Sequence, residues 1–574
     1  MRRFAVIAVF AVFAPVVFAT SVFAQAPTPK VTISGLFDQV TSMGRNFYDG
    51  NFARNSDNEW YARTRFRPDF EFAVGLVKAV LGLEIDLQYG QSGSNDGGFP
   101  GNVSGFPGGA ASPGTPTGGC KVNANGCLDI NTDVGGMIEI KWIYTEFPLT
   151  GPDSLLPFIP VETIARAGGQ PFGAMATYKL ATFAASDFAG LSTVTTFAPN
   201  IRLNLGYVIV EDQLAGANRG LPAVKTGRGE DYALIVSPEY TPLKGLDLKP
   251  LFSWFHADGV TNINSRRNLV NVRTPAQVGT PFGVLGNATS MGQPGGTAGS
   301  PAYHEDRYTI GIDARWRVGA FGLDPTIMYQ WGRMDNQAFD DGPGAPGTTS
   351  KKVTADLNAI LVDIIGSYQL GPVLLEARWN YSTGNKARDN LAKGIRYFQP
   401  LTTDGIYYAG WAQIMALGVD YFNGVSMNGM GSHIGYDRYG RNQFGVRATY
   451  TVMPPLSFYA VVSPTWTAEK VDTDTNSTLL PGAVGLTVAR TTVSANSWVK
   501  GNSNYIGTEA NLGMTWRFSA NTAFDLVGGY LFAGDALDTA ECINGTAPLC
   551  SAANVRKKSA QDAYTAAARV RLAF

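Results

Sequence analysis

Two consecutive segments of this chain alternate charged and apolar residues with a period of two. In residues 59–72 (EWYARTRFRPDFEF) most charges occupy odd positions, whereas the even positions carry large aromatic residues such as Trp60 and Phe66. In residues 77–89 (VKAVLGLEIDLQY) aliphatic residues alternate with charged or polar ones in the same way. This period is that of a β-strand, because successive side chains of a strand point to opposite faces. The short connection 73–76 therefore predicts a β-hairpin.

The same alternation recurs along the chain, and short connections between the segments alternate with long ones. Further alternating segments are 138–145, 307–318, 443–452 and 506–518. Short connections are 73–76, 319–322, 370–372, 453–455 and 519–522, and long ones fall near 90–131, 259–302, 336–352, 384–408, 467–503 and 535–560. Few segments show the helical period that would be needed to cover so much apolar sheet.

Short turns alternating with long loops are typical of a transmembrane β-barrel. The predicted fold is therefore an all-β antiparallel barrel with short periplasmic turns, long extracellular loops, an apolar lipid-facing side and a charged lumen. Eighteen strands fit the chain best and 16 come next, and residues 170–200 are ambiguous. The longest other apolar run, 359–366, is interrupted by Asp363 and is too short for a spanning helix.

Composition narrows the classes of partner. The chain has 45 Lys+Arg against 46 Asp+Glu, so its formal net charge is −1 and no basic face for nucleic acid is expected. The hydrophobic fraction of 45% excludes general disorder. The low charged fraction of 16% and the 67 glycines are compatible with a membrane barrel.

The N-terminus reads as a secretory signal peptide over residues 1–24. Arg2 and Arg3 precede an apolar run, and residues 22–24 (Val-Phe-Ala) place small residues at the predicted cleavage site. A membrane anchor is the alternative, but Pro15 interrupts the run. Residues 25–574 then form a single transmembrane barrel domain.

The four cysteines form two local pairs, Cys120 with Cys127 and Cys542 with Cys550, each in a segment expected to be a loop. In an exported protein this pattern predicts two small disulfides. Metal binding is the alternative, but neither pair has CxxC spacing or a nearby histidine.

The last residues, DAYTAAARVRLAF, form an alternating strand that ends in Phe574. It resembles the terminal strand of bacterial outer-membrane proteins, which the barrel-assembly machinery recognises, and VTISGLFDQV at 31–40 resembles the first strand of general porins. Residues 63–72, 164–173, 374–385 and 507–534 are similar to the long barrels of the alginate-export type and related porins. These resemblances imply a pore in the outer membrane of a Gram-negative bacterium, in the alginate case for a polyuronate. A homotrimer is compatible with such a barrel.

If the alternation holds, one face of the wall lines the lumen with charges of both signs. The predicted basic positions are Arg63, Arg65, Arg67, Lys78, Lys141, Arg166, Arg315, Arg317, Arg378, Arg447, Arg517, Arg569 and Arg571. The predicted acidic positions are Asp69, Glu71, Glu84, Asp86, Glu139, Glu162, Asp313, Glu376, Glu509 and Asp525. Arg63, Arg65 and Arg67 form the strongest cluster, and guanidinium groups suit carboxylate or phosphate. The alternative is that these arginines pair with Glu84 and Asp86 and serve only the shape of the barrel.

The predicted function is a porin for passive diffusion of small hydrophilic solutes or ions, with a preference for anionic or carboxylated ones. Polysaccharide export, an outer-membrane enzyme and an adhesin are the alternatives. Residues 173–190 lack alternation and predict an inward constriction loop, or else a strand. The histidines His256, His304 and His433 fall in no catalytic motif, so no catalytic residue, cofactor or metal is expected. Aromatic residues at strand ends predict interfacial girdles; these are Trp316, Trp516, Tyr329, Trp331 and Tyr381.

Overall fold

The computed structural model describes residues 28–46, 58–89, 136–171, 187–212, 230–258, 304–338, 351–386, 394–399, 401, 411–415, 439–471, 502–542 and 555–574. Its strands are β1 (Lys30–Arg45), β2 (Asn58–Val74), β3 (Val77–Tyr89), β4 (Gly136–Thr150), β5 (Glu162–Pro171), β6 (Asp187–Ala198), β7 (Ile201–Asp212), β8 (Glu230–Leu243), β9 (Leu246–Asp258), β10 (His304–Val318), β11 (Phe321–Ala338), β12 (Lys351–Leu370), β13 (Val373–Ser382), β14 (Gly394–Ile395), β15 (Arg441–Met453), β16 (Leu456–Val471), β17 (Ser503–Ser519), β18 (Thr522–Ala533), β19 (Thr539–Cys542), β20 (Val555–Lys558) and β21 (Ala563–Ala573).

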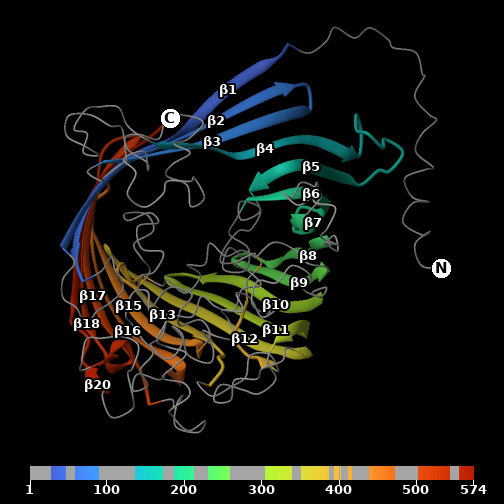
Figure 1. The fold of residues 1–574 in the computed structure, drawn as a ribbon. Helices are drawn as coiled ribbons and strands as arrows, with labels where there is room; N and C mark the ends of the chain where they lie inside the picture. The colour runs from blue at the N-terminus through green and yellow to red at the C-terminus, as the bar shows by residue number, and fades with distance from the viewer. Residues whose placement is uncertain are drawn as a thin grey trace, which may run out of the picture.

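Eighteen of these strands form one closed antiparallel barrel. Each pairs with the next along the chain, and β1 also pairs with β21, which closes the ring. Figure 1 shows the strands following one another around this ring. The two-residue β14 lies beside β12, and β19 and β20 form a separate hairpin after η6 (Asp535–Leu537). The prediction of an all-β barrel with 18 strands is confirmed.

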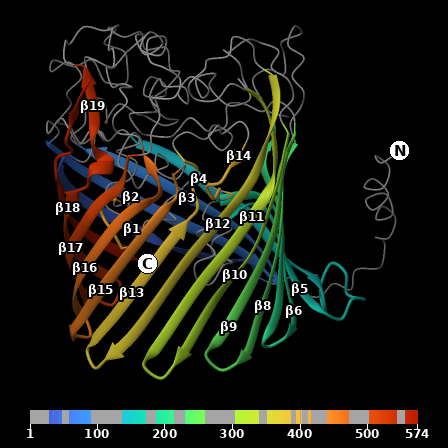
Figure 2. The ribbon, with the colours of Figure 1, turned by 90° about the horizontal axis from the view of Figure 1, so that it is seen from below.

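Tight turns gather at one end of the barrel, here called the turn end, and the strand ends that flank the longer connections lie at the opposite end, here called the loop end (Figure 2). Seven hairpins at the turn end have only two residues between their strands. Gly75, Gly319 and Gly371 take positive φ angles of 60°, 57° and 56° in three of them. Glycine adopts this left-handed conformation without the steric cost that a Cβ brings.

The connection between β4 and β5 is the exception at the turn end. It runs from residue 151 to residue 161, and sequence analysis does not single it out. It exposes Leu155 and Phe158 at 67% and 75% of their surface. Figure 1 and Figure 2 show this segment projecting away from the barrel wall.

The outer face of the barrel is apolar. Large hydrophobic side chains on nearly every strand are exposed, and Leu512 and Ile140 reach 69% and 63%. Among the predicted girdle residues, Trp316, Trp516 and Tyr329 are exposed at 41%, 46% and 40%. In the part of the chain that the structure describes, no helix is long and apolar enough to cross a membrane.

The C-terminal residue takes part in the seam where the barrel closes. Gly35 and Phe574 exchange two backbone hydrogen bonds, of 2.8 and 3.1 Å. The Phe574 ring stacks on Phe66, with 6.0 Å between ring centroids. The position of a Cβ on Gly35 would lie 2.4 Å from the Arg67 carbonyl oxygen, so only glycine lets the strands approach this closely.

A β-bulge in β4 corrects the predicted orientation of two aromatic residues. Gly82 pairs with Trp142 and Leu83 pairs with Ile140, so Lys141 is the extra residue. Such a residue reverses the alternation beyond it. Unbroken alternation through 138–145 would put Trp142 and Tyr144 on the apolar outer face with Ile140, but they lie on the inner face. There the Tyr144 ring lies 5.1 Å from the Arg166 guanidinium carbon.

Two expectations about loops also change. Residues 187–190, which fall within the predicted constriction loop 173–190, belong to β6 and pair with β5. Cys542 ends strand β19 and so does not lie in an unstructured loop. Cys120, Cys127, Cys550 and the signal peptide 1–24 lie outside the described residues, and both disulfides remain predictions.

Candidate functional site: the charged lumen

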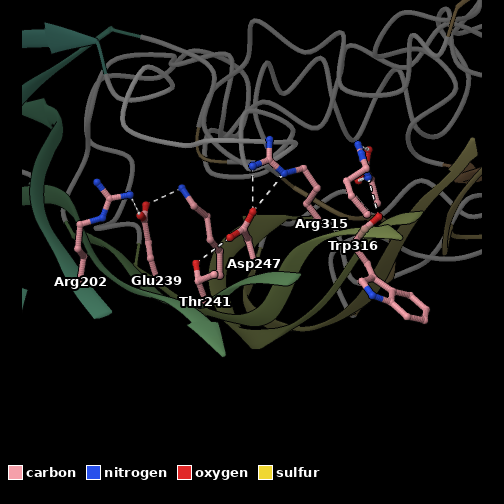
Figure 3. Close-up of polar contacts among 9 residues, drawn as sticks. Arg202, Glu239, Thr241, Asp247, Arg315 and Trp316 are labelled. Atoms are coloured by element: carbon pink, nitrogen blue, oxygen red, sulfur yellow. Dashed lines mark hydrogen bonds and ion pairs between the residues drawn. The ribbon is translucent and has the colours of Figure 1, made fainter. Parts of the chain in front are cut away.

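Oppositely charged side chains on neighbouring strands pair along the inner face of the barrel. On β7, β8 and β9, the Glu239 carboxylate lies 2.6 Å from Arg202 and 2.5 Å from Lys249. On β9 and β10, Arg315 lies 2.9 Å from Asp247. Figure 3 shows these groups on one side of the wall, whereas the neighbouring Trp316 ring points to the other. Along each of these strands, an inward charged residue is therefore followed by a residue that faces the apolar outside.

The densest charge cluster spans β18, β21 and β1–β4, and we call it the cationic arc. It contains Arg63, Arg65, Arg67, Lys141, Arg569 and Arg571 together with the carboxylates of Asp38, Glu84 and Asp525. Asp69 of β2 also lies near Arg67 and Lys141, so among the described residues six cations face four carboxylates, a formal excess of two positive charges.

Glu84 is the centre of one half of the cationic arc. Its carboxylate lies 2.9 Å from Arg65, 2.7 Å from Arg67 and 3.0 Å from Lys141. Asp525 is the centre of the other half, at 3.1 Å from Arg569 and 2.8 Å from Arg571. A single carboxylate cannot neutralise two or three cations, so each half keeps positive charge.

The three predicted ladder arginines differ in their access to the lumen. Arg63 lies 3.6 Å from Asp38 on β1 and its side chain is fully buried, and the Arg65 side chain is 9% exposed. Arg67 keeps 33% of its side chain exposed. Arg65 and Arg67 thus both pair with Glu84, as the alternative of structural pairing has it, whereas Arg63 pairs with Asp38; of the three, Arg67 keeps the most solvent-exposed side chain.

Most of the other predicted lumen residues form ion pairs that are separate from the cationic arc. Lys78 contacts Glu71 and Glu146, Arg166 contacts Glu146, Arg317 contacts Asp324, Arg378 contacts Asp363, and Arg447 lies 3.7 Å from Glu376. Asp313 is fully buried and accepts a hydrogen bond from Thr326, and Asp69 lies near the Trp142 indole. Arg517 is exposed near the turn end, and Glu162 is exposed at the start of β5. The side chains of Asp86 and Glu139 lie outside the described part of the chain.

Sequence reasoning missed several partners in these pairs. Asp38, Glu146, Arg202, Glu239, Asp247, Lys249 and Asp324 all hold ion pairs on the inner face. Most lie in strands whose alternation is broken by proline, glycine or small residues, such as 230–243 (EDYALIVSPEYTPL). Aligning charges across the tight turns would have found the pairs Glu239–Lys249 and Arg317–Asp324, because the register of neighbouring strands is fixed there, whereas the other pairs join strands connected by longer segments.

A segment between β13 and β15 folds against the inner wall. Its described residues 394–399, 401 and 411–415 are here called the inner segment. The Gln399 backbone and the Gln330 side chain of β11 exchange two hydrogen bonds, of 3.0 and 2.9 Å. Arg307 of β10 donates to the Gln399 side chain at 2.5 Å. Phe398 is 1% exposed.

Glu509 of β17 holds the other end of the inner segment. Its carboxylate accepts backbone hydrogen bonds from Gln413, from Ile414 at 2.8 Å and from Met415 at 2.9 Å. Glu509 is fully buried, so it is an anchor for this segment and does not face open solvent in the lumen. The expectation that Glu509 lines the pore is corrected accordingly.

The inner segment also packs on a notch in the wall. Gly445 faces inward on β15, and a Cβ there would lie 3.2 Å from the Trp411 ring. The inner segment thus contacts strands from β10 to β17, on the arc of the barrel that does not carry the cationic arc. Sequence analysis placed the constriction at residues 173–190, of which 173–186 lie outside the described residues.

Among known proteins, this chain resembles solved structures in fold but matches no sequence family. No family model and no curated protein matches the chain. Solved structures align over nearly its full length. Pseudomonas aeruginosa OccK8 (OprE) has 10% identity, covers 95% of this chain and 98% of its own, and gives a TM-score of 0.43. A BenF-like porin from Pseudomonas fluorescens Pf-5 has 10% identity, covers 95% of this chain and 98% of its own, and gives a TM-score of 0.42. Acinetobacter baumannii OccAB3 has 7% identity, covers 94% of this chain and 99% of its own, and gives a TM-score of 0.40.

Identities this low say nothing about the solute, so the functional assignment rests on the geometry of the lumen. The resemblance to alginate-export barrels receives no support from these comparisons.

Proposed function

We propose that the protein is a porin of the Gram-negative outer membrane, through which small hydrophilic solutes diffuse passively. The observation that carries this proposal is the inverted polarity of one closed barrel. Its outer face exposes large hydrophobic side chains, whereas its inner face carries ion pairs. A closed barrel also satisfies its backbone hydrogen bonds without a free sheet edge, which a lipid environment demands. The turn end then faces the periplasm and the loop end faces outward.

The preferred solutes of this porin are anionic or carboxylated. The cationic arc carries a formal excess of two positive charges, and Arg67 and Arg571 expose 33% and 36% of their side chains. A guanidinium with a free edge can donate two parallel hydrogen bonds to a carboxylate. Charge rings of one sign favour permeation by ions of the other.

The test is the reversal potential of single channels in planar bilayers with asymmetric salt. Wild-type protein should give discrete conductance steps and a reversal potential on the anion-selective side. Replacing both exposed arginines (Arg67→Gln, Arg571→Gln) should lower the anion-to-cation permeability ratio. Arg333→Gln is the matched control, because Arg333 is exposed beside Asp356 on the outer side of β11.

Absence of any conductance by correctly folded protein would overturn the porin assignment. A permeability ratio unchanged in the double variant would overturn only the anion preference. An adhesin would bind its ligand even when the pore is blocked. An enzyme would turn over a substrate without conducting.

Two further proposals concern partners, one from the seam at Phe574 and one from the apolar outer face. Since Phe574 ends the strand that closes the barrel, the barrel-assembly machinery would recognise this strand before closure. A homotrimer would bury part of the apolar outer face, and chemical cross-linking of membranes would detect it.

A further inference from the structure

Two of the three histidines in the chain meet at one carboxylate on the outer wall. His256 Nδ1 lies 2.8 Å from Asp306 Oδ1, and His304 Nε2 lies 3.0 Å from Asp306 Oδ2. One potential ligand atom from each residue lies within 4.8 Å of the other two. All three side chains are partly exposed, at 17%, 30% and 41% for His256, Asp306 and His304.

The pairing of β9 with β10 builds this arrangement. Asp306 is the direct cross-strand partner of His256, and His304 precedes Asp306 by two residues and so shares its face. Even positions of both strands point outward here, as the exposed Phe252 and Ile310 show. The cluster therefore lies on the outside of the barrel at the loop end, separate from the lumen and its ion pairs.

Surrounding aromatic residues hold the three side chains in place. The Trp254 indole N–H donates to Asp306 Oδ1 at 2.9 Å. The His256 ring packs on Tyr232 and Trp254, with centroid distances of 5.1 and 5.6 Å. In metal sites of proteins, a residue that donates a hydrogen bond to a ligating carboxylate orients that ligand and tunes its affinity for the metal.

The donor set is that of a borderline divalent metal ion. Zn²⁺ accepts imidazole nitrogen and carboxylate oxygen at about 2.0–2.2 Å, and it is most often tetrahedral. Ligand atoms of such a site lie about 3.3 Å apart, so the observed 2.8 and 3.0 Å separations need only small side-chain movements. Three protein ligands leave the fourth position to a water molecule on the exposed side.

We infer that His256, His304 and Asp306 form a binding site for one Zn²⁺-like ion on the outer wall at the loop end. The ion replaces the hydrogen bonds between the imidazoles and the carboxylate, and it cross-links β9 to β10 just before their long connection. Trp254 is a positioning residue that acts through Asp306. This site is independent of solute permeation, and sequence reasoning predicted no metal here.

The test uses the tag-free full chain, folded in detergent micelles without reductant. Zn²⁺ is titrated in competition with a chromogenic chelator, and Co²⁺ serves as a spectroscopic probe of tetrahedral coordination. Wild-type protein should bind one equivalent. His256→Ala, His304→Ala and Asp306→Asn should each weaken binding at least 10-fold, and Trp254→Phe should weaken it less while leaving the Co²⁺ spectrum tetrahedral.

His433→Ala is the matched control, since it removes the third histidine and should leave Zn²⁺ affinity unchanged. Heat-modifiable migration on gels reports whether each variant is folded. Two outcomes would overturn the site: no stoichiometric Zn²⁺ binding by folded wild-type protein, or equal binding by a His256→Ala/His304→Ala double variant. The second outcome would assign the metal to the cysteines or to surface carboxylates.

Discussion

Glu84 shows how one residue can serve both the wall and the solute path. Its carboxylate contacts three cations from β2 and β4, and its side chain is only 9% exposed. When one partner of a buried ion pair is removed, the remaining charge stays buried without compensation. The resulting loss of stability is larger than the net stabilisation that the ion pair provides. The cationic arc thus depends on its few carboxylates for stability and on its surplus cations for charge.

We therefore expect Glu84→Gln to lower the free energy of unfolding by about 3 kcal/mol. The same change raises the formal excess of positive charge in the cationic arc from two to three, so anion selectivity should increase. Guanidinium unfolding in lipid vesicles and reversal potentials measure the two effects. Glu71→Gln is the control, because Glu71 is 40% exposed and only contacts Lys78 at 3.4 Å. Equal stability of both variants would contradict this account.

A turn glycine offers a second prediction at the scale of single residues. Gly371 has a φ of 56° and no atom within 4 Å of the place a Cβ would occupy. Its substitution by alanine should therefore cost about 1 kcal/mol through backbone strain alone. Gly366→Ala is the matched control, because that site is equally open and its φ is not in the left-handed region. Equal unfolding midpoints for the two variants would show that strain at the turn does not matter.

At the scale of elements, the inner segment is the part most able to set the width of the pore. Hydrogen bonds to Glu509 at one end and to Gln330 at the other attach it to the wall. Buried side chains such as Phe398 and Ile414 add apolar contacts. Each attachment uses an inward side chain of a strand whose other face remains apolar.

Loss of the Glu509 carboxylate should release one end of the inner segment. Glu509→Ala removes the acceptor of three backbone N–H groups, which leaves them unsatisfied unless the segment moves toward water. We expect larger or more variable single-channel conductance and faster protease cleavage near residue 413. Glu376→Gln is the control, since Glu376 pairs with Arg447 on the neighbouring strand. Unchanged conductance and cleavage in the Glu509 variant would mean that other contacts hold the segment.

At the scale of the whole molecule, closure depends on a seam between the two ends of the chain. Ten residue pairs join β1 to β21, and Gly35 and Phe574 add a hydrogen-bonded contact beside them. The barrel has no free strand edge once this seam forms, which protects it from pairing with other chains.

We expect Gly35→Ala to impair closure, because a Cβ there would meet the Arg67 carbonyl oxygen at 2.4 Å. The fraction of heat-modifiable, folded protein should fall, and refolding into vesicles should slow. In Gly528→Ala, the new Cβ would have only the Thr565 carbonyl oxygen at 3.8 Å, so this variant should fold normally. Identical folding of the two variants would show that the seam tolerates displacement.

The architecture of this protein follows from its amino-acid sequence. The period of two in segments such as 77–89 and 506–518 is a local property of strands, and it survives in β3 and, beyond an irregularity at Ile506, in β17. Since short and long connections alternate, the same pattern also indicated which end carries the turns. The inward orientation of Arg67, Arg315 and Arg378 follows directly from this alternation.

The arrangement of the lumen depends on tertiary contacts that the sequence pattern does not show. A single bulge at Lys141 reversed the faces of Trp142 and Tyr144, and no local pattern reports a bulge. The partners of Glu84, Glu509 and Asp306 come from strands or loops that only the register brings together. Alternation reports which face a side chain takes, whereas ion pairs, anchors and metal ligands depend on contacts between segments distant in the chain.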